Sequence, residues 1–194
     1  MSLLPYASLT HRRKALRVTA DVVLLSSQTA DDDATLEFES GIDSTYGEYI
    51  FGFYKINPAS NTNFSVQFNA SGESGYNETI TDTVFYATHT EAAASALSYD
   101  TSKDQAQGTA FTNLTENQAN HADEGAAGAL HLFNPASTTY VKHFICRSSV
   151  MTNNSGAMDM FTAGYINTTA AITDVQFKCA SGNFDGLIKM WGVL

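Results

Sequence analysis

Two short acidic segments hold the side chains best placed to do chemistry. Residues Asp31–Asp33 are three consecutive aspartates, and His121, Asp123 and Glu124 lie within one polar stretch. Carboxylate oxygens are ligands for a hard cation such as Ca²⁺, but Asp31–Asp33 lacks the alternating spacing and the glycine of a calcium-binding loop. We therefore interpret both segments as polar loop tips and predict no metal site.

The sequence contains none of the common catalytic motifs. It has no G-x-S-x-G elbow, no phosphate-binding loop, no dinucleotide fingerprint and no H-E-x-x-H zinc motif. His89, His131 and His143 lie in strand-like segments, where pairing with a neighbouring strand is the expected role of a histidine. The chain has nine tyrosines, whose rings can stack on sugars, but most are expected in the core or at interfaces. We therefore predict a protein that is not an enzyme and holds no cofactor.

The charge of the chain is acidic overall and unevenly distributed. Ten lysine and arginine residues stand against 20 aspartate and glutamate residues, which gives a net charge of −10. Phosphate repels such a surface, so we predict no nucleic-acid binding by the body of the protein. Four cations, Arg12, Arg13, Lys14 and Arg17, lie close together near the N-terminus. They predict an attachment arm over residues 1–18 that docks on an acidic neighbour, with a solvated charged end as the alternative.

The sequence has no signal for a membrane. No stretch approaches the roughly 18 apolar residues of a spanning helix, and Asp21 interrupts the apolar run that follows the basic segment. We therefore expect neither membrane association nor an export signal. Cys146 and Cys179 form no metal or redox motif, and each closes an apolar strand-like run. Buried free thiols are the expected state, and a disulfide between neighbouring strands is the alternative.

The hydrophobic pattern repeats every second residue, which is typical of β-strands. In "NFSVQFNA", the side chains of Phe64, Val66 and Phe68 share one face, which predicts a half-buried strand. In "GEYIFGFYKI", both faces are apolar, which predicts a central strand covered on two sides. Similar alternation follows in "TTYVKHFICR", "ITDVQFKCA" and "DGLIKMWGVL".

About ten short strands separated by turn residues are typical of a β-sandwich or jelly roll. We predict an all-β fold over residues 19–194, an antiparallel β-sandwich of jelly-roll type with an extended N-terminal arm. Thr90–Leu97 is the best candidate for a short helix. The tetrapeptide Asn-Pro-Ala-Ser occurs at Asn57–Ser60 and at Asn134–Ser137. Because proline after asparagine fits a type I turn, we interpret both copies as hairpin turns and not as a duplicated unit or a binding loop.

Two blocks of the sequence resemble small virion proteins of tailed bacteriophages. The first block, "YGEYIFGFYKINP", is a tyrosine-rich strand that ends in a proline turn. The second block runs through "NTTAAITDVQFKCASG" and closes with "GLIKMWG", in which Met190 and Trp191 replace the usual Leu-Tyr. The two blocks and their flanks cover about a third of the chain. The matching positions are Tyr46, Tyr49, Phe51, Ile56, Pro58, Thr168, Thr169, Ala170, Ile172, Val175, Phe177, Ser181, Gly182, Gly186, Ile188 and Gly192.

This resemblance implies a structural protein of a phage particle, located in the virion after assembly in the host cytoplasm. Together with the weakly charged, aromatic-rich strands, it implies a capsid decoration or cement protein. Such a protein assembles with itself as a homotrimer and with virion proteins such as the major capsid protein or tail proteins. The alternative is a tail-fibre or receptor-binding component that recognises a bacterial surface glycan. Its candidate contact residues are the loop tips at Ser74, Tyr76, Asn153 and Asn154.

Overall fold

The computed structural model describes residues 21–194. The predicted arm over residues 1–18, with its four cations, therefore lies outside the described residues. The described part of the chain contains twelve β-strands and no helix. The strands are β1 Val22–Asp33, β2 Thr35–Phe38, β3 Glu48–Pro58, β4 Phe64–Ala70, β5 Ile80–Thr90, β6 Ser95–Tyr99, β7 Thr112–Asn113, β8 Ala126–Phe133, β9 Lys142–Thr152, β10 Gly156–Ile166, β11 Ile172–Cys179 and β12 Phe184–Val193.

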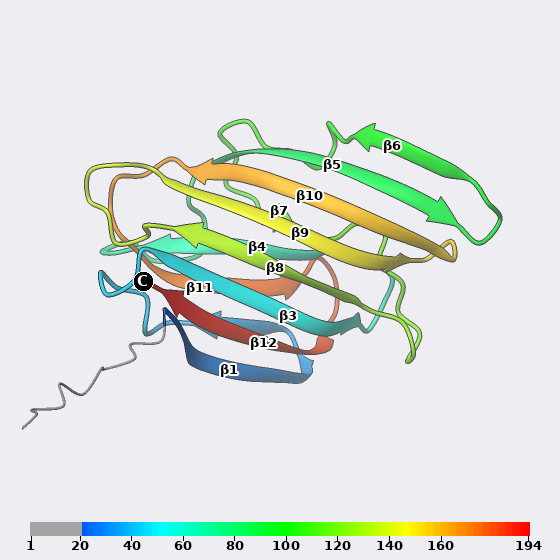
Figure 1. The fold of residues 1–194 in the computed structure, drawn as a ribbon, viewed down its shortest axis with the longest axis horizontal. Coiled ribbons are helices and arrows are strands. Elements are labelled where there is room, and N and C mark those ends of the chain that lie inside the picture. The colour runs from blue at the N-terminus through cyan, green and yellow to red at the C-terminus, as the bar shows by residue number, and fades with distance from the viewer. Residues whose placement is uncertain (1–20) are drawn as a thin grey trace, which may run out of the picture.

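The strands form two antiparallel sheets that pack face to face (Figure 1). Eight strands in the order β1-β12-β3-β8-β9-β10-β5-β6 make the large sheet, and four in the order β2-β11-β4-β7 make the small sheet. The prediction of an all-β antiparallel sandwich is confirmed. A jelly roll is built from eight strands in two Greek keys, whereas this sandwich has twelve, so the jelly-roll part stays a prediction.

Aromatic side chains from both sheets make the core. Phe51 and Phe53 of β3 face Phe64 of β4 and Phe177 of β11, and all four are fully buried. The rings of Phe64 and Phe177 are stacked, with centroids 5.8 Å apart and 11° between their planes. The ring of Phe53 lies 5.5 Å from that of Phe64. Each such pair contributes about 0.5–1.5 kcal/mol beyond the burial of its area, so the inner face of β4 is a main source of stability.

The second face of β4 is also buried, which the alternation did not predict. Ser65 is 2% exposed and Gln67 is fully buried. The Nε2 of Gln67 donates to the backbone oxygens of Glu78, Thr109 and Ala110 at 3.0–3.2 Å. A polar side chain can be buried when its donors find acceptors in this way. The prediction of a half-buried strand was therefore wrong, because a loop covers the outer face.

Strand β3 changes the direction of its side chains at Lys55. This residue has a φ of +50°, and the register of β3 with both neighbouring strands shifts near it. Such a bulge adds a residue to one strand. It returns Ile56 to the core beside Phe53, although strict alternation would place Ile56 outward. Tyr54, which precedes the bulge, points outward and is 43% exposed. The prediction of a strand covered on both faces was therefore wrong, since the outer face of β3 is open.

The two Asn-Pro-Ala-Ser segments make different connections. In the β8–β9 hairpin, the amide of Ser137 donates to the oxygen of Asn134 at 3.1 Å, which closes the predicted turn. The first copy carries the chain from β3 in the large sheet to β4 in the small sheet. There the amide of Ala59 donates to the oxygen of Asn183. The hairpin interpretation is therefore confirmed for the second copy and wrong for the first.

Residues 90–97 form a turn and the start of β6 instead of a helix. The amide of Thr90 donates to the oxygen of Ala94 at 2.8 Å, and the amide of Ala93 donates to the oxygen of Thr90 at 2.9 Å. The helix prediction was wrong, because so short a segment has a costly helix nucleus. Pairing with β5 supplies the backbone hydrogen bonds instead.

The strands of the large sheet run between two ends, which we call the terminal end and the turn end (Figure 1). At the terminal end, Val22 of β1 pairs with Val193 of β12, so the first and last described residues are close together. The turn end holds the β5–β6 and β9–β10 turns and the start of β8 at Ala126. The eleven residues of β10 pair along their whole length with both neighbours. At about 3.3 Å per residue, roughly 33 Å separates the two ends.

Candidate binding surface

The outer face of the large sheet carries a continuous row of exposed flat side chains. Tyr99, Phe85, Phe161 and Arg147 pair directly, in that order, across β6, β5, β10 and β9. Directly paired residues of antiparallel strands point to the same face. The rings of Phe85 and Phe161 are stacked, with centroids 4.8 Å apart and 3° between their planes. The guanidinium of Arg147 lies 5.0 Å from the centre of the Phe161 ring. We call these four residues the aromatic row.

Asp159 holds Arg147 in place against the row. The Nε and Nη2 atoms of Arg147 donate to the two carboxylate oxygens of Asp159 at 2.9 and 2.7 Å. These hydrogen bonds are the main reason that the pKa of Asp159 is lowered and the pKa of Arg147 is raised. A bidentate pair and a cation–π contact both fix the plane of a guanidinium. The end of the row at β9 is therefore preformed.

Large apolar side chains on and around the row are left uncovered. Phe85 is 42% exposed and Tyr99 is 52% exposed. On the same face, Leu97 is 77% exposed and Ile145 is 47% exposed. Single exposed apolar residues are ordinary on a protein surface, but a contiguous patch marks an interaction site. This face therefore has the character of a docking surface.

The strands under the aromatic row carry no net charge on their outer side, and the nearest further charge is at the β6 end of the row, where the carboxylate of Asp104 accepts from the hydroxyl of Tyr99 at 2.5 Å. Among the outward residues of β5, β6, β9 and β10, Arg147 and Asp159 are the ionised side chains at neutral pH, and they neutralise each other. Residues 1–20 contain four cations and no acid, so residues 21–194 hold 6 cations and 20 acids, a formal charge of −14. A neutral apolar face on so acidic a body is a place where two copies can meet without repulsion.

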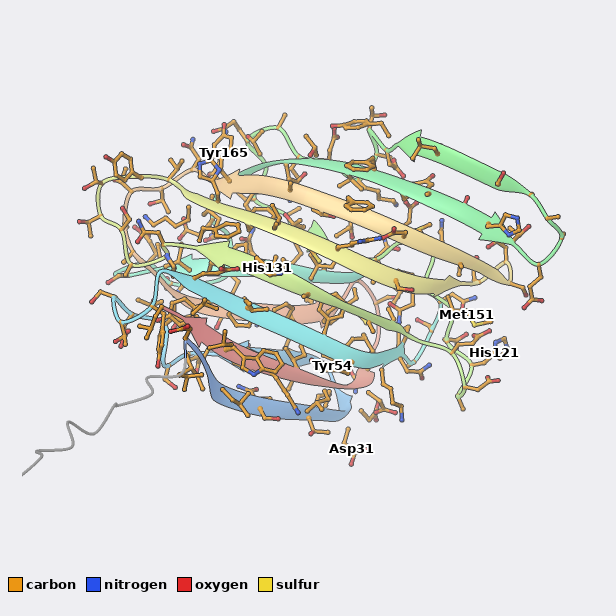
Figure 2. The ribbon with its side chains drawn as sticks, viewed as in Figure 1. Asp31, Tyr54, His121, His131, Met151 and Tyr165 are labelled. Atoms are coloured by element: carbon orange, nitrogen blue, oxygen red, sulfur yellow. The ribbon has the colours of Figure 1, made fainter. Side chains whose placement is uncertain are left out.

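A groove of about 560 Å³ lies at the turn end of the large sheet. Its walls come from β1, β3 and β12 and from the loop before β8 (Figure 2). The groove brings together the two acidic segments that the sequence separates, since Asp31 and Glu124 both line it. Tyr54, Lys55 and Asp185 lie between them. We call this feature the Tyr54 groove.

Hydrogen bonds fix the loops around the Tyr54 groove. The Nδ2 of Asn57 donates to the backbone oxygens of His121 and Glu124 at 2.8 and 2.9 Å. The Oε2 of Glu124 accepts from the backbone amide of His121 and pairs with its Nδ1, both at 2.8 Å. On the opposite wall, the Oδ1 of Asp185 accepts from the amide of Asp32 at 2.7 Å. The groove is therefore built from positioned side chains and not from free loop tips.

Two aromatic side chains converge beside the groove, over a glycine of β3. A Cβ atom on Gly52 would lie 2.8 Å from Cζ3 of Trp191 and 3.0 Å from the hydroxyl of Tyr54. A residue without a side chain lets other groups approach the backbone closely. The Nζ of Lys189 lies 6.0 Å from the centre of the Tyr54 ring. The outer face thus has a second aromatic surface, separate from the aromatic row.

The remaining candidates from the sequence, the acidic segments and the two cysteines, can be located in the structure. Within residues 21–194, no group of acids, histidines and cysteines can hold a metal ion, and Asp31–Asp33 and His121 are exposed. Cys146 and Cys179 are buried and free, as expected, and burial raises the pKa of both thiols. The alternative of a disulfide is therefore wrong.

The predicted loop tips lie at opposite ends of the sandwich. Ser74 and Tyr76 lie in the β4–β5 loop at the terminal end, where the amide of Ser71 bonds to the oxygen of Ala171. Burial is the main reason that the pKa of Tyr76 is raised, and nearby carboxylates add to it. The tips at Asn153 and Asn154 form the β9–β10 turn at the other end. One ligand site therefore cannot include both pairs.

Sequence reasoning found one cross-strand partner but missed the aromatic row. The side chain of His131 on β8 contacts that of Glu48 on the neighbouring strand β3, with Nδ1 2.5 Å from Oε1. This contact is expected for a histidine on a strand. Phe85 and Phe161 lie 76 positions apart in the sequence, in segments that are ordinary for β-strands. Their contact depends on the register between β5 and β10, which the sequence does not contain. No local signal could have identified the row.

Comparisons with models of known protein families and with curated proteins found no match for this chain. Within residues 21–194, the structure has no helix that is long and apolar enough to cross a membrane.

Proposed function

We propose that this chain is a non-enzymatic structural protein of a tailed-phage virion, a decoration or cement protein on the capsid surface that assembles as a homotrimer. The observation that carries the proposal is the aromatic row, with the exposed apolar side chains around it. An exposed patch of this kind needs a partner. The resemblance of two sequence blocks to virion proteins supports placing that partner in a phage particle.

A second copy of the chain is the partner that this surface fits best. Repulsion between bodies that each carry a formal charge of −14 over residues 21–194 is smallest where the facing surfaces hold few charges. The row ends at β6, the edge strand of the large sheet, where Tyr99 and Leu97 are exposed. A threefold axis beside this edge would bring the rows of three copies together and cover their apolar residues.

The difference between the two ends of the sandwich supports attachment through the N-terminal segment. The basic residues precede Asp21, whose backbone oxygen accepts from the amide of Leu194 at the terminal end. In the proposed arrangement this segment binds an acidic surface on a neighbouring subunit or on the capsid. The turn end, with the Tyr54 groove, then points away from the shell.

Binding to empty capsids of the same phage tests the proposed function. We expect the purified chain to sediment with the capsids and to raise their resistance to heat. Deleting residues 1–17 should abolish binding while the β body keeps its melting temperature, because the body contains its own core. A matched variant replaces the four cations by glutamine, at Arg12, Arg13, Lys14 and Arg17, and should bind as poorly as the deletion. A truncated chain that still decorates the capsids would contradict the role of the arm.

The second candidate is a receptor-binding component that recognises a bacterial surface glycan. A polar cavity of about 200 Å³ beside the β9–β10 turn favours it, because Asn153, Asn154 and Tyr86 line the cavity. Ser74 and Tyr76 lie at the terminal end, where the described chain begins at Asp21, and in the proposed arrangement they would face the particle instead. Purified protein that binds host cells or lipopolysaccharide and ignores empty capsids would favour this second function.

A further inference from the structure

The geometry points to the Tyr54 groove as a binding site for an oligosaccharide that is uncharged or carries amino groups. The inference goes beyond the proposed assembly role, because the groove and the aromatic row are different parts of the outer face. It also holds wherever the protein lies on the particle. Figure 2 shows Asp31, Tyr54 and His121 at this end of the large sheet, on segments far apart in the sequence.

An open aromatic surface is the first requirement of a sugar site, and the groove has one. Tyr54 is 43% exposed, and its hydroxyl lies close to the indole of Trp191 over Gly52. Aromatic side chains with a polar tip suit sites that are apolar on one side and wet on the other. The C–H face of a sugar ring fits such a surface. The two aromatic side chains, one at the groove and one beside it, provide room for more than one sugar unit.

Hydrogen-bonding groups that point into solvent are the second requirement. The carboxylate of Asp31 and the ammonium of Lys55 make no hydrogen bond or ion pair with another residue in the described part of the chain. The side chain of Glu124 is only 12% exposed; it accepts through Oε2, and its Oε1 bonds to none of residues 21–194. A few positioned polar groups around an apolar surface are typical of a binding site for a small molecule.

The backbone around the groove is strained in a way that positions these groups. Asp32 has a φ of +58° and Lys55 has a φ of +50°, a region that residues other than glycine seldom occupy. Beside them, a Cβ atom on Gly186 would lie 2.6 Å from Cδ1 and 3.2 Å from Cα of Ile56, so a side chain there would crowd Ile56. Bulges and strained residues gather where a side chain must be aimed at a ligand. Here Tyr54 points outward by ordinary alternation, and the bulge places Lys55 on the exposed side next to it instead of in the core.

The charge of the groove selects the class of sugar. Three carboxylates, Asp31, Glu124 and Asp185, line it. Two ammonium groups offset part of this charge, that of Lys55 in the wall and that of Lys189, 6.0 Å from the centre of the Tyr54 ring. This excess of negative charge repels sialylated or phosphorylated glycans and attracts amino groups. Neutral hydroxyls can be bound by the same carboxylates through charge-assisted hydrogen bonds.

Fluorescence of Trp191 offers a direct readout, because it is the single tryptophan of the chain. Titration of the full chain with a glucosamine tetramer should change this emission and saturate. An N-acetylglucosamine tetramer should bind more weakly, and sialyllactose should not bind at millimolar concentration. Calorimetry with the same three probes checks the affinities. Absence of binding by both tetramers at millimolar concentration, or equal binding of sialyllactose, would overturn the proposal.

Substitutions in the Tyr54 groove and in the aromatic row distinguish sugar binding from the proposed assembly. Tyr54→Ala should weaken binding of the glucosamine tetramer at least tenfold, and Tyr54→Phe should keep most of the affinity. Asp31→Asn should reduce the preference for glucosamine over N-acetylglucosamine. Tyr140→Ala, on an exposed loop at the terminal end, is the control and should bind normally. Phe85→Glu should alter assembly and leave sugar binding unchanged. Sugar binding that survives in Tyr54→Ala would place the site elsewhere.

Discussion

At the scale of single residues, the fold buries two ionisable groups in very different ways. Lys142 is fully buried on β9, and its Nζ donates to the backbone oxygens of Thr168 and Ala170 at 3.2 and 2.5 Å. The lysine therefore closes the loop before β11, although burial lowers its pKa. Glu116 is 7% exposed, and its Oε2 has no hydrogen-bond partner in the described residues. Its nearest cation is Lys103, with Nζ 3.8 Å from Oε1.

Glu116 should make the protein less stable as the pH rises. Burial, reinforced by the nearby charge of Asp100, raises the pKa of Glu116 to about 7 from an ordinary value of 4.5. The folded state therefore holds the proton more tightly than the unfolded chain. This contribution to stability is fully present below pH 4.5 and is lost as the pH rises through 7. At about 1.4 kcal/mol per pKa unit, the loss reaches up to about 3 kcal/mol.

Glu116→Gln should remove that part of the pH dependence. We expect the variant to unfold at a higher temperature than the wild type at pH 8 and at a similar temperature near pH 4.5. Thermal unfolding followed by circular dichroism between pH 4.5 and 8 measures this. The control is Glu91→Gln, which changes an exposed carboxylate on the β5–β6 turn. Parallel pH profiles for the wild type and Glu116→Gln would show that the buried carboxyl is not destabilising.

At the scale of elements, the period of two predicted which side chains of the core strands point inward. Phe64, Val66 and Phe68 are all fully buried, as read from "NFSVQFNA". The alternation failed where tertiary structure intervened, at the bulge of Lys55 and under the loop that covers Gln67. Neither feature has a local signature, because a bulge and a covering loop depend on the partner strands.

Replacing Phe64 by serine tests whether this side chain of β4 points into the core. The ring contacts Phe53, Phe177 and Phe184, with centroids 5.5–5.8 Å away. Loss of a buried aromatic ring costs about 3–5 kcal/mol. For a domain of this size that lowers the melting temperature on the order of 10 °C. Tyr140→Ser, at a position that is 69% exposed, should leave the melting temperature within a few degrees. Equal melting temperatures for Phe64→Ser and the wild type would refute the core described above.

The candidate surfaces show the same limit of sequence reasoning. The acidic segments at Asp31 and His121 are evident in the sequence, where we interpreted them as separate loop tips. They meet in one groove because β1 and β3 both flank β12, which brings distant segments to one end of the sheet. The aromatic row likewise depends on the register of β6, β5, β10 and β9. Composition and alternation predict a sandwich, but strand order decides which residues share a surface.

At the scale of the whole molecule, charge and shape divide the protein into three regions. The terminal end joins the basic N-terminal segment, the turn end holds the Tyr54 groove, and the neutral aromatic row lies on the outer face between them. We propose that the row is buried between copies of the chain. The exposed apolar side chains of the row and its surroundings, Phe85, Tyr99, Leu97 and Ile145, are otherwise left in water.

The molar mass of the full chain in solution tests this claim most directly. Light scattering during gel filtration should give about three times the 20.9 kDa of one chain for the wild type. The double variant Phe85→Glu with Leu97→Glu should give the mass of one chain, because charge repulsion then opposes burial of the row. Tyr140→Glu should keep the mass of the wild type. A wild-type protein that elutes with the mass of one chain, or a double variant that keeps the larger mass, would contradict assembly through the aromatic row.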